Sequence, residues 1–199
     1  MKRIAIIINV LAALCLAGCN TSNTGSLAGQ VVRSHDEFKG TSIDAVRLSG
    51  RSVMQRHMRD GQSTRWYSVH SSFNSTDVQD LHPERQIYLL DDGSTIDVKV
   101  NIKDTDVRHT GGVYGQAYYA VSSYIELTED QIRRMARTDT MKTAFYDGAA
   151  RKDTGEIQPP QLLAIRKFHH LFIEDNPEWT PEDEQREMAD LLAARDTSR

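Results

Sequence analysis

Cysteine is scarce in this chain of 199 residues, and its 24 lysine and arginine residues are fewer than its 28 aspartate and glutamate residues. Its two cysteines, Cys15 and Cys19, lie close together near the N-terminus, and no histidine or acidic residue stands beside them. A zinc site needs about four ligands within reach, so this spacing does not support one. The net charge of −4 argues against a nucleic-acid-binding protein, which usually carries a basic stripe. These absences leave a globular composition, with 39% hydrophobic and 26% charged residues.

Catalytic motifs and long apolar runs are missing as well. The sequence contains no nucleophile elbow, SxxK, HExxH, Walker A loop, EF-hand loop or CxxC pair. No cofactor and no metal site is therefore predicted. The longest apolar run, at residues 4–17, has 14 residues, whereas a membrane-spanning helix needs about 20.

That apolar run has the features of a secretory signal peptide. Lys2 and Arg3 precede it, and small residues follow it. Its last part, Leu16-Ala17-Gly18-Cys19, resembles the lipobox of bacterial lipoproteins, in which an aliphatic and two small residues precede the modified cysteine. The resemblance implies cleavage between Gly18 and Cys19, a diacylglycerol thioether on the Cys19 thiol, and membrane attachment through two or three acyl chains.

Two other interpretations of the cysteines stay open at this point. The first is an ordinary signal peptide in which Cys19 is incidental. The second, less favoured interpretation is a disulfide between Cys15 and Cys19. Removal of residues 1–18 would leave 181 residues and, without Lys2 and Arg3, a net charge of −4 − 2 = −6. An aspartate after the modified cysteine signals inner-membrane retention in enteric-type bacteria. Asn20 stands there instead, so the resemblance implies an outer-membrane anchor, which we expect on the periplasmic side.

The rest of the chain is predicted to be a tether followed by one domain. Residues 19–30 contain the lipidated cysteine and small polar residues, a composition typical of a flexible linker. Residues 31–199 are predicted to form a single α+β domain, with helices packed on one face of a mostly antiparallel sheet. Strands are expected at residues 42–49, 65–73, 86–90, 95–102, 117–127 and 141–148.

The clearest predicted element is a hairpin around Asp92-Gly93, a dipeptide that favours a two-residue turn. This turn would pair Leu89 with Ile96 and Ile87 with Val98. The apolar faces of the two strands would then coincide, which supports the register.

Three helices are expected to complete the domain. Thr128 and Gln131 form a capping-box pattern at the start of the first. The other two lie near the C-terminus, after Pro159-Pro160 and at Thr180-Pro181, where proline suits the first helical turn.

Several segments are weak candidates for binding sites. The sequence GGVYG at residues 111–115 reads as a loop, and Tyr114 would be its contact if it binds a ligand. The sequence DTD at residues 104–106 offers two carboxylates, but a calcium site needs six or more oxygens, and a solvated turn is favoured. His169 and His170 are adjacent on a helix and point about 100° apart, so a shared metal ion is disfavoured.

Two classes of function remain. The first is a non-catalytic envelope lipoprotein, held at the membrane through Cys19, that binds an envelope protein or a cell-wall ligand. The second is an envelope hydrolase whose histidine and carboxylate meet only in the folded chain, with His70 and Asp97 as the first suspects. Aromatic residues on the predicted strands could line a groove, although such residues more often pack within the sheet: Trp66, Tyr67, Tyr118, Tyr119 and Tyr124.

Overall fold

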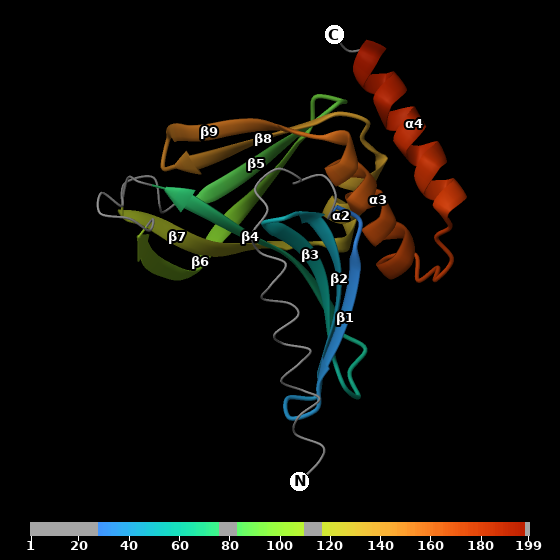
Figure 1. Cartoon of the computed structure of the whole chain (residues 1–199), viewed down its shortest axis with the longest axis horizontal. Coiled ribbons are helices and arrows are strands. Elements are labelled where there is room, and N and C mark those ends of the chain that lie inside the picture. Colours follow the sequence, from blue (N-terminus) through green and yellow to red (C-terminus); the bar gives the residue numbers. More distant parts are fainter. Residues whose placement is uncertain (1–27, 76–82, 110–116, 198–199) are drawn as a thin grey trace.

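The computed structural model describes residues 28–75, 83–109 and 117–197 (Figure 1). The predicted signal peptide, the cleavage site at Gly18 and Cys19, and most of the predicted tether lie outside these residues. Tyr114 and the GGVYG segment lie outside them as well.

The predicted α+β class is confirmed by a nine-stranded sheet and the helices that pack on it. The strands are hydrogen-bonded in the order β1-β2-β3-β4-β7-β6-β5-β8-β9, and every neighbouring pair is antiparallel. Their bounds are Val31–Asp36 (β1), Thr41–Ser49 (β2), Ser52–Arg59 (β3), Arg65–Ser75 (β4), Arg85–Leu90 (β5), Thr95–His109 (β6), Ala117–Leu127 (β7), Met141–Asp147 (β8) and Ala150–Ile157 (β9). The helices are Glu129–Arg137 (α2), Pro159–Phe172 (α3) and Pro181–Thr197 (α4).

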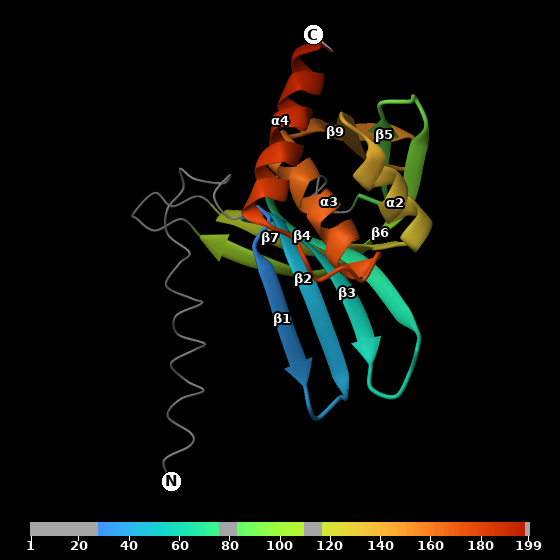
Figure 2. The same ribbon diagram turned by 90° about the vertical axis from the view of Figure 1, so that its right-hand side faces the viewer.

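Helix α3 is the centre of the packing. The sheet curls so that β1–β4 and β5, β8 and β9 form two wings, and α3 lies in the angle between them (Figures 1 and 2). Phe168 of α3 is fully buried and meets Tyr67 of β4 edge to face, with ring centroids 6.3 Å apart. Helix α2 packs beside α3, and α4 lies on the outer side of α3, where Leu191 is its one buried residue. We call the helix-covered face of β2–β4 and β7 the inner face and the opposite one the outer face.

Side chains that alternate along a strand place apolar residues on one face of the sheet and polar residues on the other. In β6, Ile96, Val98 and Val100 are buried, whereas Asp97 and Lys99 between them are exposed. The predicted half-buried strand is therefore confirmed, although β6 continues to His109 and so includes residues 104–106, for which a turn was expected.

The predicted hairpin exists, but its register was wrong by one residue. Tyr88, not Leu89, pairs with Ile96. The loop has three residues, because Leu90 bonds to Ser94 across it, and Gly93 takes a left-handed conformation with φ of 78°. Tyr88 and Leu90 consequently point into the core, and Leu89 is 42% exposed.

The predicted starts of α2 and α4 are confirmed, whereas α3 begins at Pro159 itself and not after Pro159-Pro160. The Thr128 hydroxyl accepts a hydrogen bond from the Gln131 amide at 3.2 Å, and the Gln131 side chain accepts one from the Thr128 amide at 2.8 Å. Thr180 and Asp183 make the equivalent reciprocal bonds, both at 3.1 Å, at the start of α4. These bonds satisfy amide groups that have no partner within the helix.

Three strands were not predicted: β1, β3 and β9. Strand β1 is an exposed edge strand without an apolar face. Its ladder begins before Val31, because the Gly29 amide donates to the Arg47 carbonyl at 2.8 Å, within the range predicted as tether. No helix in the described part of the chain is both long enough and apolar enough to cross a membrane.

Candidate functional site

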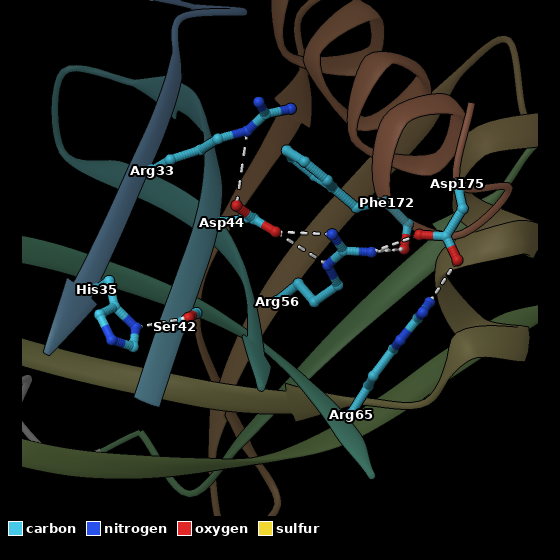
Figure 3. Close-up of polar contacts among 8 residues, drawn as sticks. All are labelled: Arg33, His35, Ser42, Asp44, Arg56, Arg65, Phe172 and Asp175. Atoms are coloured by element: carbon cyan, nitrogen blue, oxygen red, sulfur yellow. Dashed lines mark hydrogen bonds and ion pairs between the residues drawn. The ribbon is translucent and has the colours of Figure 1, made fainter. Parts of the chain in front are cut away.

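A paired network of charges lies on the inner face, at the C-terminal end of α3 (Figure 3). Arg56 of β3 is only 9% exposed and donates two hydrogen bonds to one oxygen of Asp44 on β2, at 2.7 and 3.2 Å. Its other terminal nitrogen donates to the Phe172 carbonyl at 3.0 Å and to Asp175 at 2.6 Å. Arg65 of β4 binds the second oxygen of Asp175, also at 2.6 Å.

This inner network joins three strands to the end of α3. Arg56 also stacks over the Phe172 ring, with its guanidinium carbon 4.9 Å from the ring centroid. Hydrogen bonds from Arg65, and then from Arg56, hold the pKa of Asp175 below its usual value. Asp175 has a left-handed backbone with φ of 52°, which aspartate tolerates better than most residues. Each buried charge in the network has a partner, so its role is structural.

The outer face carries a row of four rings. His57 of β3 stacks on Trp66 of β4, with centroids 5.2 Å apart and planes 5° from parallel. His57 approaches His70 at 6.2 Å, and His70 stacks on Tyr124 of β7 at 5.5 Å. Strand register produces the row, since His57 pairs with Trp66 and His70 with Tyr124. Trp66 is 41% exposed, so the ring row presents an aromatic surface to solvent.

One end of the ring row opens into a cavity of about 410 Å³ at the β2–β3 turn. His70 lines both features. The cavity also contains three cations, Arg47, Arg51 and Lys103, and none of the described residues that line it is acidic. Among the described residues, the remaining polar lining consists of five serines: Ser52, Ser71, Ser72, Ser122 and Ser123.

The two histidines of the ring row favour their neutral forms. Burial lowers the pKa of His70, and the charge of Lys103 lowers it further. Burial lowers the pKa of His57 as well, with a smaller contribution from His70. The His57 Nε2 lies 2.8 Å from the Ser68 hydroxyl, which gives the ring a fixed orientation. At neutral pH the positive charge of the cavity therefore comes from Arg47, Arg51 and Lys103.

His70 and Asp97, the suspects for a hydrolytic site, are not brought together. His70 pairs with Tyr124 of β7, and Tyr124 pairs in turn with Asn101 of β6. Asp97 lies four residues further along β6, about 13 Å at the usual rise of a strand. Its carboxylate is bound by Arg85 from the neighbouring strand. The charge of Lys103 lowers the pKa of His70, and a cation is unsuited to orienting a general base.

The other sequence candidates are separate from the ring row. His169 and His170 both approach Glu174, at 3.5 and 3.4 Å. Within the described residues, no three histidine, cysteine or acidic side chains are placed to hold a metal ion. Of the aromatic candidates, Trp66 and Tyr124 belong to the ring row, whereas Tyr67 is buried in the core.

Sequence reasoning did not find His57, Arg47 or Lys103. His57 was missed with the whole of β3, because Arg56 occupies an inward position of that strand and obscures its alternation. Arg47 of β2 reaches the cavity only through the pairing of β2 with β3 and of β3 with β4. Lys103 of β6 reaches it only through the pairing of β4 with β7 and of β7 with β6. The sequence did contain one indication of the outer face: Trp66, Ser68 and His70 alternate with apolar residues on β4.

Comparisons with protein-family models, with curated proteins and with solved structures find no significant match to this chain. The functional argument therefore depends on the geometry of the outer face. Its two features are the exposed ring row and the cation-lined cavity that continues from it.

Proposed function

We propose that this chain is a lipid-anchored protein of the bacterial envelope and that it acts as a non-catalytic binding module for a cell-wall saccharide. Cys19 would carry the lipid and hold the domain at the outer membrane. The outer face of the sheet would carry the ligand. The observation that supports this most is the ring row with the cavity at its end.

The anchor part of the proposal is supported by the sequence. A basic start, an apolar run of 14 residues and the Leu16-Ala17-Gly18-Cys19 box occur together and in the required order. One acyl chain binds a membrane only marginally, whereas two or three give stable attachment. Ala28, where the described residues begin, is nine positions after Cys19, which in the random-coil regime spans about 15–18 Å. The domain would thus stand close to the membrane surface.

The binding part is supported by the polarity of the outer face. Flat rings offer apolar surface with polar edges, which suits the alternating C–H and hydroxyl faces of a sugar. Trp66 stays 41% exposed although it stacks on His57. Neutral histidines extend this surface without adding charge at neutral pH. A binding role fits this arrangement better than hydrolysis, because the charge that acts on His70 is that of Lys103, and Asp97 is bound by Arg85.

The experiment separates the anchor from the binding surface. Full-length protein is produced in a bacterial host with radiolabelled palmitate. We expect label on the wild type and on Cys15→Ala, and none on Cys19→Ala. Label on Cys19→Ala would contradict the anchor.

The same preparations in mild detergent are then sedimented with purified cell-wall sacculi. We expect Trp66→Ala to reduce the bound fraction at least threefold. Phe38→Ala is the matched control, because Phe38 is a fully exposed aromatic residue in the β1–β2 turn, away from the ring row. An equal loss in both variants, or no binding by the wild type, would contradict the binding role.

A further inference from the structure

The cations of the cavity differ from most arginines of the domain in having no carboxylate partner among the side chains that the structure describes. Arg56, Arg85 and Arg166 each form ion pairs. Among the described residues, none of the ion pairs involves Arg47, Arg51 or Lys103. The Nε atom of Arg47 is buried and has no hydrogen-bond partner in the described part of the chain.

An unpaired arrangement of this kind is unfavourable without a ligand. Three like charges around one cavity repel each other, and a buried donor without a partner lowers the stability of the fold. An anion in the cavity would offset the repulsion among these cations, because guanidinium groups form paired, charge-assisted hydrogen bonds with phosphate and carboxylate oxygens. Ser72 and Ser122, which line the cavity and alternate onto the same face as His70 and Tyr124, add two further hydroxyl donors.

We propose that this cavity binds the phosphate group of a phosphorylated saccharide, whose sugar lies on the ring row. This inference rests on the proposed function and names its ligand class. A phosphate monoester carries about −1.5 to −2 charges near pH 7, which matches several cations better than a single carboxylate does. The cavity volume of about 410 Å³ lies in the range of small-molecule sites, larger than one phosphate needs.

The position of His70 connects the two parts of the site. It lines the cavity and stacks on Tyr124 within the ring row. A ligand with its phosphate between Arg51 and Lys103 would therefore extend its sugar over His70 toward His57 and Trp66. The cavity provides the charge recognition, and the ring row provides the stacking surface.

Isothermal titration calorimetry of the full-length protein in neutral detergent tests this inference. The probes are inorganic phosphate, N-acetylglucosamine 1-phosphate and N-acetylglucosamine. We expect the sugar phosphate to bind at least tenfold more tightly than either phosphate or the neutral sugar. Lys103→Gln should weaken the binding of both phosphate probes at least fivefold. Trp66→Ala should reduce the affinity for the sugar phosphate and leave that for phosphate unchanged.

Lys99→Gln is the matched control, since Lys99 is also an exposed lysine of β6 but does not line the cavity. The inference is overturned if the sugar phosphate does not bind, if the neutral sugar binds equally well, or if Lys99→Gln causes the same loss as Lys103→Gln. Sedimentation with sacculi that depends on Trp66, combined with no binding of the sugar phosphate, would overturn this inference while leaving the binding role intact. No Trp66-dependent sedimentation would instead contradict the proposed function.

Discussion

The two faces of the sheet use the same residue type in opposite ways. On the inner face, Arg56 is buried and is bound by Asp44, Asp175 and the Phe172 carbonyl. On the outer face, Arg47 and Arg51 line an open cavity and form no ion pair with a described carboxylate. A buried charge needs partners to be tolerated in the fold. A charge left without partners at a cavity is available to a ligand.

The largest expected effect comes from breaking the inner network. Arg56→Ala would leave Asp44 with a side chain 12% exposed and without its main partner. Removing one member of a buried pair typically costs about 3–5 kcal/mol of stability. Urea unfolding followed by circular dichroism measures the loss.

Arg33→Ala is the matched control for that loss. Arg33 also approaches Asp44, at 3.6 Å, but its side chain is 65% exposed. An exposed pair of this kind contributes less than about 1 kcal/mol. Similar losses in Arg33→Ala and Arg56→Ala would show that the buried network is not what stabilises the inner face.

An intermediate effect is expected from pH, through the histidines of the ring row. The pKa values of His57 and His70 are lowered in the folded protein. Between the unfolded value of 6.5 and these lower folded values, the unfolded chain binds more protons than the folded one. The free energy of unfolding should therefore decrease as pH falls below 6.5.

His70→Gln should reduce this pH dependence, and urea midpoints measured across the acidic range would show it. His57 and His169, whose pKa is also lowered by burial, would account for the remaining slope. The charged or polar groups around His70 come from four strands: Arg47, His57, Lys103 and Tyr124. An unchanged slope in His70→Gln would mean that the ring row does not titrate with folding.

The hairpin shows which part of the fold could be predicted from the sequence. Its two strands and the position of its turn were correct, because alternation and Asp92-Gly93 are local signals. Its register was not, because Ile87 and Leu89 are as apolar as Tyr88 and Leu90. Either pair could face the core, and glycine suits both a two-residue and a three-residue loop. Tyr88 and Leu90 share one buried core with residues of α2 and α3, and the local sequence does not contain this long-range burial.

The outer-face site was largely beyond prediction for a related reason. Its rings come from β3, β4 and β7, and the order in which those strands pair is set by long-range contacts. Strand β3 was hidden because Arg56 faces inward. That position is tolerated through Asp44 on the neighbouring strand and through Asp175, more than a hundred residues away in the sequence. A histidine and a tryptophan could be seen on one face of β4, but their partners could not.

The smallest expected effect on stability comes from Arg51→Gln, which tests the difference between the two faces most directly. Arg51→Gln removes a charge of the same type as Arg56, but from an exposed position without an ion-pair partner among the described residues. Exposed substitutions of this kind usually change stability by less than about 0.5 kcal/mol. Relief of repulsion from Arg47 and Lys103 should offset part of any loss. Urea unfolding should therefore give a midpoint close to that of the wild type, while calorimetry shows weakened binding of the sugar phosphate. A destabilisation comparable to that of Arg56→Ala would instead make the outer-face cations structural, and the two faces would no longer differ in kind.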